Sequence, residues 1–210
     1  MDYKFIQCEN ITCRLRMPID MDQFNGQFCP RCGGLMKVAV DSINGPEWKE
    51  KPPKKKRQMV VVLDNIRSAY NVGAIFRTAD GLGVLKLYLC GITPTPNDTG
   101  ALVKTGLGAE KTIPWEYQPD GLALGRALKD QGYHLIALER TPAAQFINDY
   151  RPESSDLGPI ALVLGNEKAG VDPGIIAVCN DVIALPMMGR KGSLNVAVAF
   201  GAAAYWLLFV

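Results

Sequence analysis

Four cysteines near the start of the chain have the residue type and the spacing of a metal site. Cys8 and Cys13 form one pair, and after a gap of 15 residues Cys29 and Cys32 form a second pair within C-P-R-C-G-G. Two thiolate pairs on turns can close a tetrahedral shell around Zn²⁺, and glycines beside a pair let backbone N–H groups approach sulfur. A structural zinc would also explain how so short a segment folds. Redox-active or incidental cysteines are the alternatives.

Two further motifs place polar residues at loops and helix starts. In the first (residues 63–84), Asn71 could cap a helix and Arg77 follows in its second turn. In the second (residues 161–173), Gly165, Asn166 and Glu167 follow directly on an apolar stretch. Taken alone, a simple helix cap, a solvated arginine and a loop carboxylate would explain these residues without any function.

The third motif, residues 182–200, is the most informative one. An apolar stretch runs into Pro186, a loop with two glycines and the cations Arg190 and Lys191 follows, and Ser193 and Asn195 stand at the start of a long apolar helix. Capping alone would explain Ser193. It does not explain why the loop is both cationic and rich in glycine beside a second polar residue.

The elements that must position these motifs belong to an α/β fold. From residue 59 onward, apolar strands alternate with helical stretches, and strands rich in Val, Ile and Leu suit a parallel sheet covered on both faces. The predicted strands are residues 59–63, 85–90, 134–139, 160–165 and 181–186. The predicted helices are residues 71–82, 98–105, 121–131, 173–178 and 194–208. Because ligands of such sheets bind at the carboxyl ends of the strands, the second motif lies where a ligand is expected.

Charge divides the chain into unequal parts. Residues 1–57 hold 11 Lys or Arg against 7 Asp or Glu, which gives +4, whereas the remainder holds 12 against 14, which gives −2. A polyanion would therefore be met first by the beginning of the chain. We predict a zinc-ribbon-like module over residues 1–48, a basic Pro/Lys-rich linker over residues 49–58 and a catalytic domain over residues 59–210.

The sequence gives no sign of a membrane protein. Charges are spread through the first residues, so no signal peptide is expected. The apolar run at residues 196–210 has 15 residues, fewer than the roughly 18 to 20 that a membrane span needs. We expect a cytoplasmic protein with no membrane partner.

The three motifs, in this order and at these spacings, resemble those of the SpoU (TrmH-like) branch of the SPOUT methyltransferases. The resemblance covers residues 59–210, including residues 100–115 between the first two motifs. It implies a parallel sheet with a C-terminal deep trefoil knot, a rare exception to the unknotted norm. It also implies a homodimer through the knot region and the C-terminal helix, S-adenosyl-L-methionine as cofactor, and methylation of a ribose 2′-oxygen in RNA.

The family's functional residues can be carried over onto matching positions. The catalytic positions implied are Asn71, Arg77, Glu167, Ser193 and Asn195. The cofactor positions implied are Leu138, Glu139, Gly165, Asn166, Ile183, Leu185, Met187 and Leu194. One departure is Ala197, where many relatives carry a second small polar residue.

Arginine is a poor general base, because guanidinium keeps its proton up to a pKa above about 12. Our hypothesis is therefore that Arg77 binds the neighbouring phosphate and stabilises the developing alkoxide. Ser193 and Asn195 would orient the ribose, while Asn71 and Glu167 would hold the loops. The zinc module and the basic residues 54–57 would select the RNA, a tRNA or an rRNA.

Three alternatives stay open. A non-catalytic knotted RNA-binding or assembly protein would keep the fold without the activity. Methylation of a base rather than a ribose would use the same cofactor. A nucleotide-dependent α/β enzyme with a zinc ribbon is a third class, but the chain has neither a full G-x-G-x-x-G fingerprint nor a Walker lysine pattern.

Overall fold

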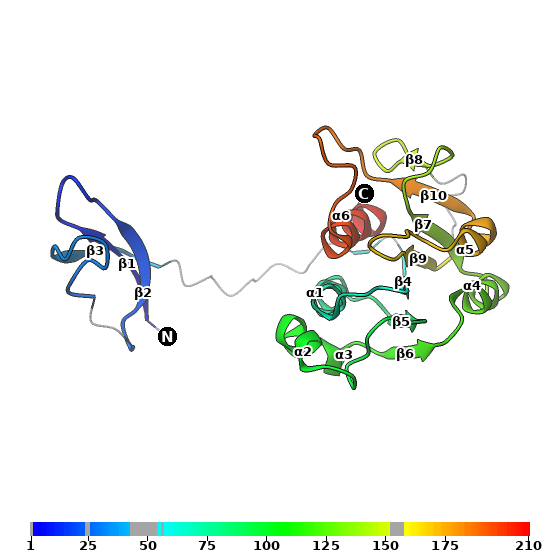
Figure 1. Cartoon of the computed structure of the whole chain (residues 1–210), viewed down its shortest axis with the longest axis horizontal. Helices are drawn as coiled ribbons and strands as arrows, with labels where there is room; N and C mark the ends of the chain where they lie inside the picture. The colour runs from blue at the N-terminus through cyan, green and yellow to red at the C-terminus, as the bar shows by residue number, and fades with distance from the viewer. Residues whose placement is uncertain (1, 24–25, 43–53, 56, 152–157) are drawn as a thin grey trace. The chain divides into compact units, whose positions relative to one another are not determined.

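The computed structural model describes residues 2–23, 26–42, 54–55, 57–151 and 158–210. The chain divides into two compact units, Met1–Pro52 and Pro53–Val210 (Figure 1). Most of the predicted linker, residues 49–53 and 56, lies outside the described residues.

The N-terminal unit contains an antiparallel sheet of three strands in the order β2-β1-β3. The strands are β1 (Tyr3–Cys8), β2 (Arg16–Asp20) and β3 (Met36–Asp41). Its buried apolar residues are Ile6, Cys8, Ile19 and Cys29. So small a core needs an additional staple, such as a metal.

The C-terminal unit is built on a parallel sheet of seven strands in the order β6-β5-β4-β9-β7-β10-β8. The strands are β4 (Met59–Asp64), β5 (Lys86–Cys90), β6 (Trp115–Gln118), β7 (His134–Leu138), β8 (Gln145–Phe146), β9 (Ile160–Leu164) and β10 (Asp181–Ala184). All five predicted strands are present. The two that the sequence did not predict, β6 and β8, are the edge strands; they are short and carry half-buried or exposed side chains, so they lack the apolar signal.

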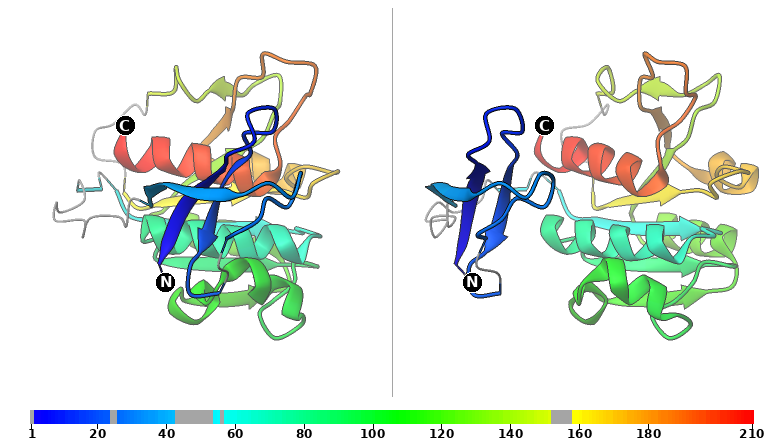
Figure 2. Two further views of the ribbon diagram at one scale, coloured as in Figure 1. Left: turned by 90° about the vertical axis from the view of Figure 1, so that its left-hand side faces the viewer. Right: turned by 60° about the vertical axis from the view of Figure 1, so that its left-hand side comes forward.

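Six helices cover this sheet within the described residues. They are α1 (Ala69–Leu82), α2 (Gly100–Gly106), α3 (Ala109–Thr112), α4 (Gly121–Asp130), α5 (Pro173–Val178) and α6 (Val196–Phe209). Figures 1 and 2 show α1 and α6 side by side on one face of the sheet, while α4 and α5 lie on the other. Alternate residues of β4 serve the two faces: Val61 and Leu63 pack with α1 and α6, whereas Val60 and Val62 pack with α4 and α5.

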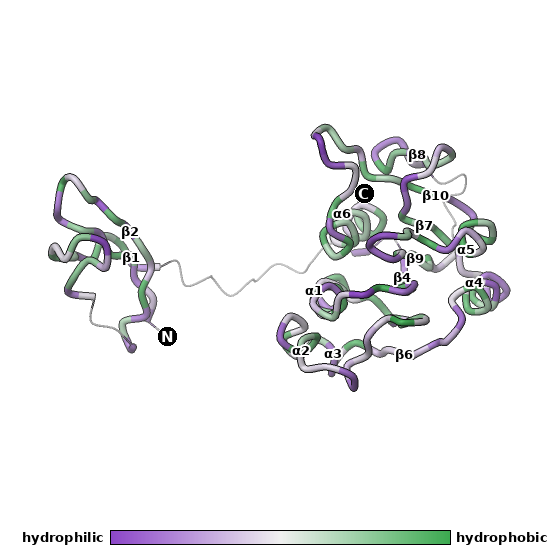
Figure 3. The backbone as a smooth tube through the Cα atoms, viewed as in Figure 1, coloured by the Kyte–Doolittle hydropathy of each residue, from purple (hydrophilic) through white to green (hydrophobic). Residues whose placement is uncertain are grey.

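Helix α6 is hydrophobic over most of its length (Figure 3). Its buried side chains, among them Phe200 and Leu208, join the core beside α1. Within the described ranges, none of the helices has both the length and the apolar character that a membrane crossing requires.

The predicted starts of α1, α2 and α6 are each wrong by two residues, and at α1 and α6 the reason is that a different polar residue caps the helix. Helix α1 begins at Ala69, since the Ser68 hydroxyl accepts a hydrogen bond from the backbone N–H of Asn71 (3.3 Å). Helix α6 begins at Val196, since the Asn195 amide oxygen accepts hydrogen bonds from the N–H groups of Ala197 and Val198. The side chain of Asn71 is thereby left available for other contacts.

Candidate active site and metal site

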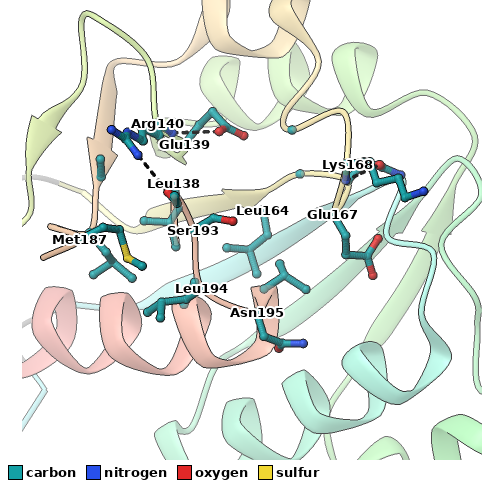
Figure 4. A pocket seen from close by; sticks show the side chains of 18 residues that line it. Leu138, Glu139, Arg140, Leu164, Glu167, Lys168, Met187, Ser193, Leu194 and Asn195 are labelled. Carbon is teal, nitrogen blue, oxygen red and sulfur yellow. Dashed lines mark hydrogen bonds between the residues drawn. The ribbon is translucent and has the colours of Figure 1, made fainter. Parts of the chain in front are cut away.

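A cavity of about 360 Å³ opens at the carboxyl ends of β7, β9 and β10, beside the N-terminal end of α6 (Figure 4). This is the edge of the sheet where α/β proteins bind ligands. Seven of the eight predicted cofactor residues line it: Leu138, Glu139, Gly165, Asn166, Leu185, Met187 and Leu194. The eighth, Ile183, is fully buried in β10 and does not line the cavity. Its side chain belongs to the core, so only its backbone could serve a ligand.

The predicted catalytic residues divide into two groups. Glu167, Ser193 and Asn195 line the cavity, whereas Asn71 and Arg77 do not. Arg77 is exposed on α1, and no hydrogen bond or ion pair is recorded for it among the described residues. The fold therefore brings together the second and third motifs at the cavity, and the first motif reaches it through Asn71.

A chain of hydrogen bonds joins all three motifs beside this cavity. Asn71 donates from its amide nitrogen to the Glu167 carboxylate (2.9 Å). Asn195 donates in turn to the amide oxygen of Asn71 (2.9 Å) while its own oxygen caps α6. The pairing of β4 with β9, which aligns Leu63 with Leu164, brings the first two motifs side by side across about 100 residues of sequence. The chain of contacts fixes the start of α6 relative to the loop after β9.

Glu167 is also bound to the loop that precedes α1. Its two carboxylate oxygens accept the backbone N–H groups of Arg67 (2.8 Å) and Ser68 (3.0 Å). Partial burial acts to raise the pKa of this carboxyl, but the hydrogen bonds from Arg67, Asn71 and Ser68 outweigh it and hold the pKa below its usual range. Glu167 is thus ionised at neutral pH and acts as an acceptor that clamps a loop, not as an acid.

The loop after β9 is stabilised by its own backbone and by Asn166. Asn166 and Gly170 exchange two backbone hydrogen bonds of 2.9 Å, and the Asn166 amide nitrogen donates to the carbonyl of Asn65 (2.6 Å). A Cβ at Gly165 would lie 2.1 Å from the backbone nitrogen of Val171. Gly165 is therefore required by the tight return of this loop, because any side chain there would collide with the backbone of Val171.

The loop between β10 and α6 is attached to β7 by a residue that the sequence analysis missed. Arg140, which also lines the cavity, donates from its guanidinium to the carbonyl of Gly192 (3.1 Å). Glu139 beside it accepts the N–H of Val171 (3.0 Å). Both residues therefore hold loops around the cavity. The one sequence signal for Arg140 is its position directly after Leu138 and Glu139, which were predicted to bind the cofactor.

Ser193 differs from its neighbours because its hydroxyl is exposed at the cavity and has no recorded hydrogen-bond partner among the described residues. The amide of Asn195, by contrast, is engaged at both ends, with α6 and with Asn71. Of the two residues predicted to orient the ribose, Ser193 is the one with a free polar group.

Replacing Arg140 should weaken cofactor binding more than turnover. We expect Arg140→Ala to raise the KM for S-adenosylmethionine, the cofactor that the resemblance implies, about tenfold. Loss of one charge-assisted hydrogen bond frees the loop that carries Ser193. Steady-state kinetics at varied cofactor concentration measures this. Arg126→Ala, at an exposed arginine of α4, is the matched control and should leave KM unchanged. Equal KM values for the two variants would contradict a positioning role for Arg140.

In the N-terminal unit the four predicted ligand atoms lie together. The Sγ atoms of Cys8, Cys13, Cys29 and Cys32 all lie within 4.8 Å of one another, with Cys8 and Cys32 separated by 3.5 Å and Cys13 and Cys29 by 3.7 Å. Zinc–sulfur bonds of about 2.3 Å in a tetrahedron place the sulfurs about 3.8 Å apart. A Cβ at Gly34 would lie 3.4 Å from the sulfurs of both Cys8 and Cys32. The arrangement suits a four-thiolate zinc site.

Comparison with known proteins agrees with this geometry. The model of the SpoU rRNA Methylase family matches residues 58–205. The tRNA (guanosine(18)-2'-O)-methyltransferase of Thermus thermophilus is 32% identical over 149 residues, which are 70% of this chain and 72% of that protein. The 23S rRNA (guanosine-2'-O-)-methyltransferase RlmB of Haemophilus influenzae is 31% identical over 169 residues, which are 78% of this chain and 64% of that protein.

Solved structures of RNA methyltransferases have a similar fold. The AdoMet-bound rRNA methyltransferase from Sinorhizobium meliloti superposes with a TM-score of 0.65 at 27% identity, over 71% of this chain and 55% of that one. The A. aeolicus TrmH/SpoU tRNA modifying enzyme superposes with a TM-score of 0.62 at 29% identity, over 73% of this chain and 76% of that one. This chain thus spans little more than half of the S. meliloti structure.

These findings confirm the predicted α/β fold with its parallel sheet, and the prediction of an RNA methyltransferase that uses S-adenosylmethionine. The trefoil knot stays a prediction, as do the individual roles of the site residues. The region matched by the family model begins at residue 58 and leaves out the N-terminal unit. From residue 58 onward, the chain belongs to the SpoU rRNA Methylase family.

Proposed function

We propose that the protein transfers the methyl group of S-adenosylmethionine to the 2′-oxygen of a ribose in tRNA or rRNA. The observation that carries the proposal is the cavity at the carboxyl edge of the sheet, beside which all three motifs are joined by Asn71, Glu167 and Asn195. When bound, the cofactor supplies an electrophilic methyl group on a sulfonium. A carbon–oxygen bond forms, a carbon–sulfur bond breaks and the hydroxyl proton passes to solvent, so the products are a methyl ether, a thioether and a proton.

The cavity fits such a cofactor. Its volume lies in the range of small-molecule sites, roughly 300 to 1,000 Å³. Leu138, Leu185 and Leu194 offer apolar contacts for a purine ring. Along residues 187–191, no hydrogen bond to another described residue is recorded for the backbone, so polar groups of the cofactor can bind there.

The residues of the chain have separate roles in this proposal. The exposed hydroxyl of Ser193 orients the ribose, whose 2′-hydroxyl must approach in line with the carbon–sulfur bond. Asn71, Glu167 and Asn195 keep the two loops of the cavity in register. Arg77 does not line the cavity, and its role rests on the family resemblance: it binds the phosphate next to the acceptor ribose and stabilises negative charge on the attacking oxygen.

Substitution of Arg77 tests the last role. We expect Arg77→Lys to lower kcat about 100-fold, because an ammonium cannot make the planar bidentate contact that a guanidinium makes with a phosphate. Single-turnover methylation with saturating cofactor measures the chemical step. Since Arg77 is exposed, the variant should fold normally. Near-normal turnover of the lysine variant would show that the bidentate role is wrong.

We also propose that the protein acts as a homodimer through α6. Val198, Ala202 and Tyr205 are exposed at spacings that place them on one face of this helix. An exposed apolar face on an otherwise buried helix is typical of a subunit interface. Light scattering should find a dimer for the wild type and a monomer for Tyr205→Asp. Val103→Asp, at an exposed position of α2, is the control and should remain dimeric; a monomeric wild type would contradict the proposal.

The N-terminal unit has two proposed tasks. We infer that Cys8, Cys13, Cys29 and Cys32 hold a structural Zn²⁺ and that the unit, with the basic residues 54–57, selects the RNA. An enzyme of tRNA or rRNA would meet its substrate in the cytoplasm, which stays our prediction for its location.

Mapping 2′-O-methyl groups in total RNA from cells with and without the gene tests the proposed function. One or a few positions in tRNA or rRNA should lose the modification when the gene is absent. An unchanged profile, with S-adenosylmethionine binding shown by calorimetry, would point to methylation of a base. Failure to bind the cofactor at millimolar concentration would favour a non-catalytic RNA-binding protein.

A further inference from the structure

One face of the N-terminal sheet is apolar and exposed. Side chains alternate along the central strand β1, so that Ile6 and Cys8 point to the buried side. Tyr3 and Phe5 point to the opposite side, where they are 42% and 36% exposed. Exposed apolar side chains that gather on one face are typical of an interaction site.

The neighbouring strands extend this face. Phe5 is paired with Pro18 of β2 and with Val40 of β3, and directly paired residues of antiparallel strands point to the same side. Both neighbours are exposed. Tyr3 and Phe5 are two residues apart on one strand, about 7 Å, so each ring can stack with a separate flat group.

Positive charge borders the same face. Gln7, the next residue of β1 on this side, is paired with Arg16 and with Lys37. Both cationic side chains are exposed, although Lys37 also lies 3.8 Å from the Glu9 carboxylate.

The acidic residue at the other end of this face is used locally. Asp20, which is paired with Tyr3, accepts the backbone N–H of Asp22 (3.1 Å) and so serves its own turn. The face therefore presents two aromatic rings with two cations at one end. This combination suits a flexible polyanion that carries flat groups, such as single-stranded RNA, better than it suits the apolar surface of a protein.

We propose that this face, formed by Tyr3, Phe5, Pro18 and Val40 with Arg16 and Lys37, binds unpaired bases of the RNA substrate by stacking. The aromatic rings take the bases, and the two cations contact the phosphates beside them. The inference rests on the proposed function, because it assumes that the substrate is RNA. It goes further by assigning the recognition of single-stranded RNA to one face of a sheet that lies outside the family region.

Two oligonucleotide probes separate stacking from charge. One is a 12-nucleotide oligouridylate, and the other is an abasic ribose phosphate of the same length, which keeps the phosphates but has no bases. Fluorescence anisotropy with the full-length protein should show that the oligouridylate binds at least about tenfold more tightly than the abasic probe. Equal affinity for the two probes would overturn the proposal, and would also be the result if the face binds a protein.

Variants place the effect on this face. We expect the double variant Tyr3→Ala/Phe5→Ala to bind the oligouridylate at least tenfold more weakly and the abasic probe unchanged. Tyr3→Trp should retain the preference, because it restores a stacking surface. Val38→Ala is the matched control. Val38 is half-exposed, but a register shift between β1 and β3 at Phe5 and Ile6 pairs it with the buried Ile6, on the side opposite to Val40. A double variant that keeps the preference for bases would contradict the inference.

Two measurements keep this test separate from the proposed function and from misfolding. Zinc content and circular dichroism of the double variant should match the wild type. Calorimetry with S-adenosylmethionine reports on the catalytic unit alone. If the protein binds the cofactor but shows no preference for bases, the stacking face is wrong and the methyltransferase proposal stands. If it prefers bases but does not bind the cofactor, the methyltransferase proposal is wrong and the stacking face stands.

Discussion

Replacing Glu167 with Gln should lower kcat/KM about 100-fold, although the side chain keeps its size. The carboxylate accepts three N–H groups, from Arg67, Ser68 and Asn71. An amide offers a single acceptor oxygen and turns an NH₂ group toward a donor, so at least one charge-assisted hydrogen bond is lost, each worth about 1.5 to 3 kcal/mol. A 100-fold change corresponds to about 2.7 kcal/mol of transition-state free energy. Methylation kinetics at varied RNA concentration measures the effect.

The physical reason is that Glu167 acts through its neighbours. Without the carboxylate, the amide nitrogen of Asn71 loses its acceptor. Asn195, which donates to Asn71 and also caps α6, then loses its fixed position. Glu116→Gln is the matched control, because this half-exposed carboxylate lies on β6 at the far edge of the sheet, paired with Lys86. Wild-type kcat/KM in the Glu167 variant would show that the hydrogen-bonded chain does not organise the site.

Removing one thiolate from the cysteine cluster should abolish metal binding and unfold the N-terminal sheet. We expect wild-type protein to carry one zinc ion per chain and Cys29→Ser to carry almost none. Because the unit buries so few apolar residues, we expect the metal to supply most of its folding free energy, as in zinc fingers, where the apparent value is roughly 10 to 16 kcal/mol. Elemental analysis gives the zinc content, and limited proteolysis reports on the sheet.

The control for this variant is Cys179→Ser, because Cys179 lies on the C-terminal unit outside the cluster. It should retain zinc and the folded sheet. Cofactor binding should survive in Cys29→Ser, since the cavity is formed entirely by the other unit. A Cys29→Ser protein with full zinc and a protected N-terminal unit would contradict the metal site.

The strands and the site loops could be predicted because their signals are local. Five apolar runs gave five strands, and the parallel arrangement placed the second and third motifs at one edge. The edge strands β6 and β8 were missed because edge positions need no continuous apolar run. The starts of α1 and α6 were wrong because several residues able to cap stood close together, and only the backbone geometry selects among Ser68, Asn71, Ser193 and Asn195.

The hydrogen-bonded chain of Asn71, Glu167 and Asn195 could not be predicted from spacing. Its partners are 96 and 124 residues apart and meet only because β9 pairs with β4 and α6 packs against α1. Arg140 was missed for a similar reason, since its contact with Gly192 crosses 52 residues. The family resemblance indicated that Asn71, Glu167 and Asn195 matter, but only the fold explains how they act together.

The central claim is that a ribose 2′-oxygen accepts the methyl group, and identification of the labelled nucleoside tests it most directly. Purified protein would be incubated with methyl-labelled S-adenosylmethionine and RNA from cells that lack the gene, and the RNA digested to nucleosides for chromatography and mass spectrometry. We predict that the label appears in a 2′-O-methylnucleoside, and that the Glu167→Gln variant incorporates it about 100-fold more slowly at limiting RNA. Label in a methylated base, or none in RNA despite bound cofactor, would contradict the claim.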